Sequence, residues 1–239
     1  MIDGFRERLA GAAVLLDFDG TLAPIVARPQ DARPLLGTAD ILAALAPRVR
    51  ALAIVTGRPS TTVRALLGDV PGVRIIGLYG FEELPPVDAH VLETVEAVSG
   101  AFPGTQIEPK GASVAVHFRN APDPDAAGAA IRPRLESVAE ANGMRLLEGK
   151  RVWELAPADA GGKGEAVAGV LAEVEPTAVL YAGDDLADLE AFDVLDGVGG
   201  SVLVRKVAVL GDETPAVLRE AADVVVEGPA GLLELLRGL

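Results

Sequence analysis

Residues 12–22 read AAVLLDFDGTL, in which five apolar residues are followed directly by Asp17, Phe18, Asp19 and Gly20. An apolar run that stops abruptly at polar turn residues is typical of a buried strand in a parallel sheet. Asp17 and Asp19 are two residues apart, so both project from the same side of an extended segment, and Gly20 allows a sharp turn behind them. We therefore predict a buried strand that delivers two carboxylates at its carboxyl end.

Three further apolar runs end in the same manner, at residues 51–58 (ALAIVTGR), 73–80 (VRIIGLYG) and 177–185 (TAVLYAGDD). Helix-like segments separate or follow these runs, at residues 34–46, 60–67, 163–174 and 185–195. Ser60 is predicted to cap the second of these helices and Asp185 the fourth. Strands that alternate with helices indicate a doubly wound, mainly parallel α/β sheet, where ligands bind beyond the carboxyl ends of the strands. The acidic and hydroxyl residues lie at those ends.

The middle of the chain has a different sequence pattern from its two flanks. We predict an inserted α+β cap domain at residues 84–157 and a core domain made of residues 1–83 and 158–239. Leu84-Pro85-Pro86 and the small residues of 157–162 are the candidate linkers. Within the insert we expect a half-exposed strand at 113–120 and a hairpin over 144–155 around Gly149-Lys150. A helix should run from Asp123-Pro124 to about residue 141.

Composition excludes several classes of function. The 239 residues contain no cysteine and only two histidines, His90 and His117, which rules out a cysteine nucleophile, disulfides and sites built from several histidines. The net charge of −14 opposes nucleic acids and anionic membrane surfaces as partners. The N-terminus lacks a secretory signal and no apolar run approaches membrane-spanning length, so we expect a cytoplasmic protein.

The carboxylate pair at the first strand suggests phosphoryl chemistry. One carboxylate can attack phosphorus while its neighbour protonates the leaving oxygen, and both Asp17 and the backbone carbonyl of Asp19 can bind Mg²⁺. The alternative is a solvated Asp-Gly turn. Directly after a buried strand, we favour the functional interpretation.

Two other places could hold phosphate. Thr56 can donate a hydroxyl hydrogen bond, and Gly57 before Arg58 lets backbone N–H groups approach phosphate oxygens, although the same triplet is also an ordinary turn. Lys163 opens a predicted helix, where the helix dipole disfavours positive charge, so stabilisation of a transferring phosphoryl group would account for its position. A merely solvated lysine is the alternative.

The fourth run delivers Gly183, Asp184 and Asp185, and Asp188 follows in the first helical turn. Clustered carboxylates repel one another unless a cation lies among them, and a hard, oxygen-rich cluster suits Mg²⁺. Asp185 taken alone could simply cap the helix.

These four blocks, in this order, resemble the haloacid dehalogenase superfamily of aspartyl phosphatases, which implies a Rossmann-like core. The resemblance implies that Asp17 is the nucleophile and Asp19 the general acid and base. It further implies that Thr56 and Lys163 bind phosphate. Asp184 would bind the metal together with Asp17 and Asp19, and Asp185 and Asp188 would be supporting residues.

Within that superfamily the chain is similar to the trehalose-6-phosphate phosphatase family. The similarity rests on DGTLAPIV at 19–26, GLYGFE at 77–82, EPKG at 108–111, VAVHFR at 114–119 and WEL at 153–155. It implies a phosphatase of trehalose biosynthesis that binds a small sugar phosphate. The chain departs from the family pattern at Gly162, where an Asp or Asn is usual, and at Ala187 and Leu189.

In the cap, strand alternation puts His117 and Arg119 on one face of their strand, and Glu108 and Lys110 likewise share a face. Taken alone, these residues fit an exposed sheet face with weak ion pairs. With the resemblance, we predict that Glu108, Lys110 and Glu154 recognise the sugar, joined by His117 and Arg119.

Several rival functions stay open at this point. The nearest is another sugar phosphatase with a cap, acting on sucrose phosphate or a glycosyl-glycerate phosphate. A phosphomannomutase would retain and return the phosphate. A catalytically dead regulator that binds phosphosugars would have no need of a nucleophile.

Overall fold

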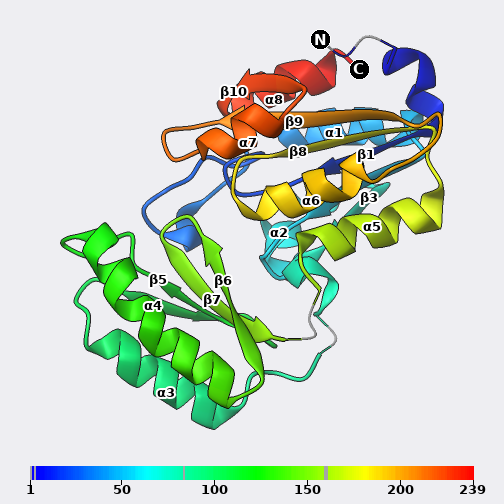
Figure 1. Cartoon of the computed structure of the whole chain (residues 1–239). Coiled ribbons are helices and arrows are strands. Elements are labelled where there is room, and N and C mark those ends of the chain that lie inside the picture. Colours follow the sequence, from blue (N-terminus) through cyan, green and yellow to red (C-terminus); the bar gives the residue numbers. More distant parts are fainter. Residues whose placement is uncertain (1, 3, 83, 159–160) are drawn as a thin grey trace. The chain divides into compact units, whose positions relative to one another are not determined.

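The computed structural model describes residues 2, 4–82, 84–158 and 161–239. The chain divides into two compact units, unit 1 with Met1–Gly80 and Gly161–Leu239, and unit 2 with Phe81–Ala160 (Figure 1). The predicted core boundary at residue 83 and residues 159–160 of the predicted linker lie outside the described residues. No helix in the described part of the chain has the length and apolar composition needed to cross a membrane.

Unit 1 contains a sheet of six parallel strands in the order β10-β9-β8-β1-β2-β3. The strands are β1 Ala12–Leu16, β2 Ala51–Val55, β3 Val73–Ile76, β8 Ala178–Gly183, β9 Leu203–Leu210 and β10 Val224–Glu227. Each of the four predicted runs contains one strand, and the predicted doubly wound α/β class is confirmed. We did not predict β9 and β10, because Arg205-Lys206 interrupts the apolar pattern of one and the other has only four residues.

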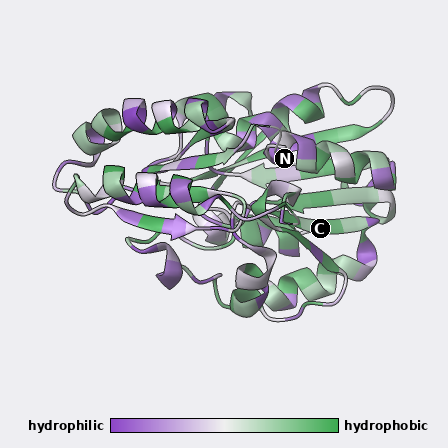
Figure 2. Ribbon diagram, turned by 90° about the horizontal axis from the view of Figure 1, so that it is seen from below, coloured by the Kyte–Doolittle hydropathy of each residue, from purple (hydrophilic) through white to green (hydrophobic). Residues whose placement is uncertain are grey.

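Alternate residues of the strands pack on opposite faces of this sheet. Val14 and Leu16 of β1 join one buried cluster with helices α1 (Thr38–Leu45) and α8 (Gly228–Arg237), whereas Ala13 and Leu15 join another with helices α5 (Lys163–Val174) and α6 (Ala187–Asp196). The helices of unit 1 are α1 Thr38–Leu45, α2 Ser60–Leu67, α5 Lys163–Val174, α6 Ala187–Asp196, α7 Ala216–Ala221 and α8 Gly228–Arg237, with short 3₁₀ turns η1 Arg6–Gly11, η2 Pro29–Asp31, η3 Ala46–Arg48 and η4 Gly77–Gly80. Helices in Figure 2 carry both green and purple segments, as expected where one face packs on a core.

Two predicted helix starts and both predicted caps need correction. The first helix begins at Thr38 rather than at residue 34, because Gly37 adopts a left-handed backbone with φ 89°. Ser60 lies inside α2 and Pro59 occupies the N-cap. Asp185 precedes the N-cap Leu186 of α6, so that helix begins two residues later than predicted. The predicted limits of α2 and α5 are confirmed.

Unit 2 is an antiparallel sheet in the order β4-β5-β7-β6 with two helices. Its elements are α3 Ala89–Gly100, β4 Gln106–Pro109, β5 Val114–His117, α4 Pro124–Ala141, β6 Met144–Gly149 and β7 Val152–Pro157. The predicted helix is confirmed, since the Asp123 side chain accepts a hydrogen bond from the N–H of Ala126. The hairpin turns at Lys150-Arg151, one residue later than predicted, and α3 and β4 were not predicted.

Candidate active site

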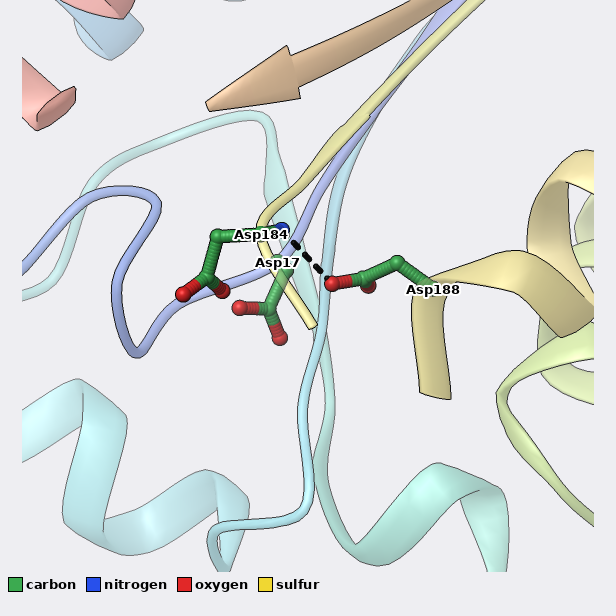
Figure 3. Close-up of side chains that lie close together, drawn as sticks. All are labelled: Asp17, Asp184 and Asp188. Atoms are coloured by element: carbon green, nitrogen blue, oxygen red, sulfur yellow. Dashed lines mark hydrogen bonds between the residues drawn. The ribbon is translucent and has the colours of Figure 1, made fainter. Parts of the chain in front are cut away.

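The site lies where β1 and β8 end side by side in the centre of the larger sheet. From β1 the strand order runs to β2 in one direction and to β8 in the other, which makes this pair the switch point where doubly wound sheets bind ligands. The N–H of Asp17 donates to the carbonyl of Ala182 at 2.9 Å, so Asp17 and Asp184 leave neighbouring strands together. Both aspartates are buried. Figure 3 shows them converging with Asp188 of α6.

Asp188 binds protein groups with both of its carboxylate oxygens. Oδ1 accepts hydrogen bonds from the Lys163 ammonium and the Tyr181 hydroxyl, each at 2.6 Å. Oδ2 accepts from the backbone N–H groups of Asp184 and Asp185 at 2.7 and 2.8 Å. Four donors therefore occupy this carboxylate, which braces the turn between β8 and α6 and holds Lys163.

Lys163 is the first residue of α5, and its side chain is only 4% exposed. The ammonium donates to Asp17 Oδ1 at 2.8 Å as well as to Asp188. A buried lysine paired with two carboxylates excludes the alternative of a solvated lysine. The two carboxylates also offset the unfavourable position of a cation at a helix N-terminus.

The electrostatics of the cluster favour a bound cation. Burial raises the pKa of Asp17 to about 7, against the opposing effect of Lys163, and Asp188 raises it further. Burial opposes the charge of Lys163, yet Asp17 and Asp188 hold its pKa well above the ordinary value. Oxygen atoms of Asp17, Asp184 and Asp188 lie within 4.8 Å of one another, and the Lys163 ammonium contacts Asp17 and Asp188. Three buried carboxylates with hard oxygen donors at this spacing fit a divalent cation such as Mg²⁺.

Asp19 points to Arg58 rather than into this cluster. The Arg58 guanidinium binds both oxygens of Asp19, with Nε at 2.6 Å and Nη2 at 2.7 Å, and Nη2 also donates to the carbonyl of Pro29 at 2.8 Å. Arg58 is 7% exposed and lies over the ring of Phe18. The residue predicted to bind phosphate therefore fixes the orientation of the predicted general acid.

Thr56 and Gly57 follow β2, the neighbour of β1 on the other side. Thr56 is buried, and its hydroxyl oxygen accepts a hydrogen bond from the N–H of Arg58 at 3.1 Å. The three segments that follow β1, β2 and β8 thus leave the same edge of the sheet, together with Lys163 at the start of α5.

Gly20 is required by the closeness of the two central strands. Its φ is 82°, and a Cβ added there would lie 1.8 Å from Asp184 Oδ2. No other residue could turn the chain at this point without displacing the Asp184 carboxylate.

The departure from the family pattern at Gly162 has a structural explanation. A Cβ at Gly162 would lie 2.1 Å from Oε2 of Glu190 on α6, and the same oxygen accepts a hydrogen bond from the N–H of Gly164 at 3.3 Å. Glu190 thus supplies to the first turn of α5 the acceptor that an Asp or Asn at position 162 would provide. Leu189, the second departure, packs against the core cluster beneath α6, whereas nothing in the structure explains Ala187.

The predicted sugar-binding residues gather in unit 2. Lys110 Nζ lies 2.9 Å from Glu154 Oε2, the Ser113 hydroxyl donates to Glu154 Oε1 at 2.6 Å, and all three side chains are buried. His117 Nε2 lies 2.8 Å from Glu108 Oε2 in a more exposed pair, and Arg119 Nη2 donates to the carbonyl of Lys150 at 3.2 Å. A buried, hydrogen-bonded pair differs from the weak surface ion pairs of the alternative interpretation.

Sequence reasoning did not single out Ser113 or Tyr181. Each is a hydroxyl residue inside an apolar stretch, and its partner is distant in sequence or on another element. An isolated hydroxyl in a predicted buried segment is the only signal that could have pointed to them, because a buried hydroxyl requires a hydrogen-bond partner.

The doubly wound sheet, with a buried cluster of aspartates and a lysine at its switch point, has the fold of haloacid dehalogenase-like proteins. The sequence model of the trehalose-phosphatase family matches residues 15–216. The chain therefore belongs to the trehalose-phosphatase family.

Three known proteins illustrate the similarity. The chain is 35% identical to an uncharacterized glycosyl hydrolase of Mycobacterium tuberculosis, over 81% of the chain and 16% of that protein. It is 33% identical to the trehalose-phosphate phosphatase of Mycobacterium marinum, over 81% of the chain and 54% of that protein. The chain thus spans about half or less of the length of these relatives. The C-terminal domain of trehalose-6-phosphate phosphatase from C. albicans has the same fold, with a TM-score of 0.78, 24% identity and coverage of 98% and 94% of the two chains.

Proposed function

We propose that the chain hydrolyses trehalose 6-phosphate to trehalose and phosphate, with Mg²⁺ as cofactor and Asp17 as the nucleophile. The observation that carries the proposal is the buried pair of Asp17 and Lys163 within the cluster of Asp17, Asp184 and Asp188. The name of the family and the relative from Mycobacterium marinum support the choice of substrate.

Within the cluster, Asp188 has a structural role and the other two aspartates would be metal ligands. Because Asp188 already accepts four hydrogen bonds, Asp17, Asp184 and the backbone carbonyl of Asp19 are the groups that would hold Mg²⁺. The bound ion would offset the negative charge of the phosphoryl group and the carboxylates.

The reaction proceeds in two displacements at phosphorus. In the first, a carboxylate oxygen of Asp17 forms a bond to phosphorus, the bond from phosphorus to the sugar oxygen breaks, and Asp19 donates a proton to that oxygen. In the second, water attacks the phosphorus of the aspartyl phosphate, Asp19 accepts a proton from the water, and the bond to Asp17 breaks.

The surroundings of the nucleophile hold the phosphoryl group. In the described part of the chain, two acceptors contact the Lys163 ammonium, which carries three N–H donors, so one donor is left for a phosphoryl oxygen. Thr56 and the backbone at Gly57 would contribute further donors. Lys110 and Glu154 in unit 2, with Glu108, His117 and Arg119, would bind the sugar hydroxyls.

Phosphate release from a panel of sugar phosphates with Mg²⁺ tests the proposal. Trehalose 6-phosphate should be the best substrate, ahead of sucrose 6-phosphate and mannose phosphates. Asp17→Asn should lower the rate by at least about a thousandfold, since the amide cannot form the intermediate. Asp193→Asn, on the exposed side of α6, is the matched control and should keep the wild-type rate. A preference for another sugar phosphate would refute the substrate, and an undiminished Asp17→Asn variant would refute the mechanism.

A further inference from the structure

The turn after β3 contains two adjacent residues in a strained backbone conformation. Leu78 has φ 46° and ψ 36°, and Tyr79 has φ 54° and ψ 26°, within η4. The left-handed region brings Cβ close to the following carbonyl oxygen, so residues other than glycine rarely occupy it. Two consecutive residues in this region persist only where surrounding contacts hold them, and such strain is concentrated at functional sites.

The contacts that hold this turn come from the segment predicted to bind phosphate. The N–H of Leu78 donates to the carbonyl of Arg58 at 3.0 Å, and the N–H of Tyr79 donates to the carbonyl of Thr56 at 3.1 Å. The backbone on both sides of Gly57 is therefore fixed to η4.

The side chain of Tyr79 reaches two groups of the site. A Cβ at Gly57 would lie 2.7 Å from the Tyr79 hydroxyl oxygen and 3.0 Å from its Cζ, so the end of the phenol lies directly against Gly57. The Lys163 ammonium lies 5.9 Å from the centroid of the Tyr79 ring, within the range of a cation–π interaction. Tyr79 thus contacts the loop and the lysine from one position.

We propose that Tyr79 is a positioning residue of the phosphoryl-binding site, whose ring steadies the Lys163 ammonium and packs against the loop at Gly57. The inference rests on the proposed phosphatase activity but not on the identity of the sugar. Phosphoryl transfer depends on donors held in place before the substrate arrives, and small displacements of such donors lower the rate.

A purely structural role predicts a different residue here. Glycine adopts the left-handed backbone without strain and occupies both ends of this turn, at Gly77 and Gly80. If the turn served only the chain path, glycine at position 79 would be at least as stable. The substitution Tyr79→Gly relieves the backbone strain and at the same time removes the contacts of the ring. It therefore distinguishes the effect of the strain from the effect of the ring contacts.

The experiment measures hydrolysis of p-nitrophenyl phosphate, inhibition by inorganic phosphate and the thermal midpoint for wild type, Tyr79→Gly, Tyr79→Leu and Tyr79→Phe. Tyr79→Gly and Tyr79→Leu should lose about tenfold or more in kcat/KM and bind inorganic phosphate more weakly. Tyr79→Phe keeps the ring and should stay within about threefold of wild type. Tyr79→Leu keeps an apolar side chain, so it also tests the ring should the glycine variant fold poorly.

Glu175→Gly is the matched control. Glu175 is an exposed residue at the end of α5 with φ 44°, so glycine relieves the same strain far from the ring. It should raise the thermal midpoint without changing activity. The proposal is overturned if Tyr79→Gly and Tyr79→Leu keep wild-type kcat/KM, or if activity falls only with the folded fraction while the inhibition constant for phosphate is unchanged. A wild-type protein that hydrolyses no phosphate monoester would instead overturn the proposed function and this inference with it.

Discussion

At the scale of single residues, the pairing of Arg58 with Asp19 decides how the proposed proton donor is held. A bidentate contact fixes both the position and the plane of the carboxylate. Arg58 can therefore affect catalysis through Asp19 even if it never contacts the phosphate. Its second contact, to the carbonyl of Pro29, holds the guanidinium itself in place.

The dependence on the leaving group distinguishes these roles. Asp19→Asn should slow phosphorylation by trehalose 6-phosphate about a hundredfold or more, and phosphorylation by p-nitrophenyl phosphate much less, because nitrophenolate leaves without a proton. Arg58→Gln should show the same pattern in a weaker form. Single-turnover rates for both substrates provide the measurement. Equal losses on both substrates for Arg58→Gln would instead assign the arginine to the phosphate.

The sequence predicted which residues meet at the site better than it predicted their individual contacts. Asp17, Thr56 and Asp184 follow from the rule that parallel strands place their carboxyl ends at one edge, whereas Lys163 was predicted from its place at the N-terminus of a helix. By contrast, the contact of Arg58 with Asp19 depends on side-chain conformations, which the spacing of residues in the sequence does not determine. The same is true of Asp188, whose four hydrogen bonds come from α5, from β8 and from the turn that follows β8.

At the scale of elements, the junction of α5 and α6 sets the place of Lys163. Glu190 of α6 accepts a hydrogen bond in the first turn of α5, and Gly162 leaves room for its carboxylate. Lys163 follows Gly162 directly, so this contact steadies the backbone that carries the lysine.

A double-mutant cycle tests this junction. Glu190→Ala should lower the free energy of unfolding by about 0.5–1 kcal/mol, because it removes an acceptor and a negative charge at a helix N-terminus. In a Gly162→Asn background the loss should be smaller, because the new side chain can cap α5 itself. Chemical denaturation of the four proteins gives the coupling energy, with the exposed Glu220→Ala as control. Additive effects would show that Glu190 does not serve as the acceptor for α5.

Element prediction succeeded where an apolar run ended in turn residues and failed where that contrast was weak. Residues 12–16 and 178–183 are buried on both faces and therefore read as continuous apolar runs. In β9, Arg205 and Lys206 are only partly buried and interrupt such a run. Register and neighbours arise from tertiary packing, which a local pattern does not contain.

At the scale of the whole molecule, we propose that the two units bind different parts of the substrate. Unit 1 would hold phosphate and metal, and unit 2 would recognise the sugar. Glu108→Gln and Glu154→Gln should then lower kcat/KM for trehalose 6-phosphate about tenfold to a hundredfold, because a charged hydrogen bond to a hydroxyl contributes about 1.5–3 kcal/mol. Hydrolysis of p-nitrophenyl phosphate should change little.

Stability must be measured beside activity in this test, because Glu154 is buried against Lys110. Loss of one partner leaves a buried charge unpaired and can unfold the surrounding structure. Glu148→Gln, at an exposed position of β6, is the control for glutamate removal in the same sheet. Equal losses on both substrates at an unchanged thermal midpoint would assign these residues to general catalysis rather than to sugar recognition.

At the proposed metal site, Mg²⁺ would compete with protons for the same buried carboxylates, which would couple the stability of the protein to pH. Burial raises the pKa of Asp17 to about 7, while Lys163 lowers it and Asp188 raises it. An aspartate in an unfolded chain titrates near 3.9. From about pH 4 to about pH 7 the folded protein therefore keeps a proton on Asp17 that the unfolded chain has lost, so the contribution of Asp17 to the stability of the metal-free protein falls as pH rises through this range.

Mg²⁺ should reverse this trend, because a ligand that binds the deprotonated folded site stabilises it most where no proton competes. We expect the thermal midpoint of the wild type in EDTA to fall between pH 5 and pH 8 relative to that of Asp17→Asn, and the increase on adding Mg²⁺ to be larger at pH 8. Asp17→Asn removes the titrating group and should weaken both effects while leaving the titrations of the other residues in place. The thermal midpoint in EDTA could instead change with pH equally in wild type and in Asp17→Asn. That result would show that Asp17 is not the group that links proton binding to stability. An equal Mg²⁺ effect at both pH values would show that the ion binds without displacing a proton from Asp17.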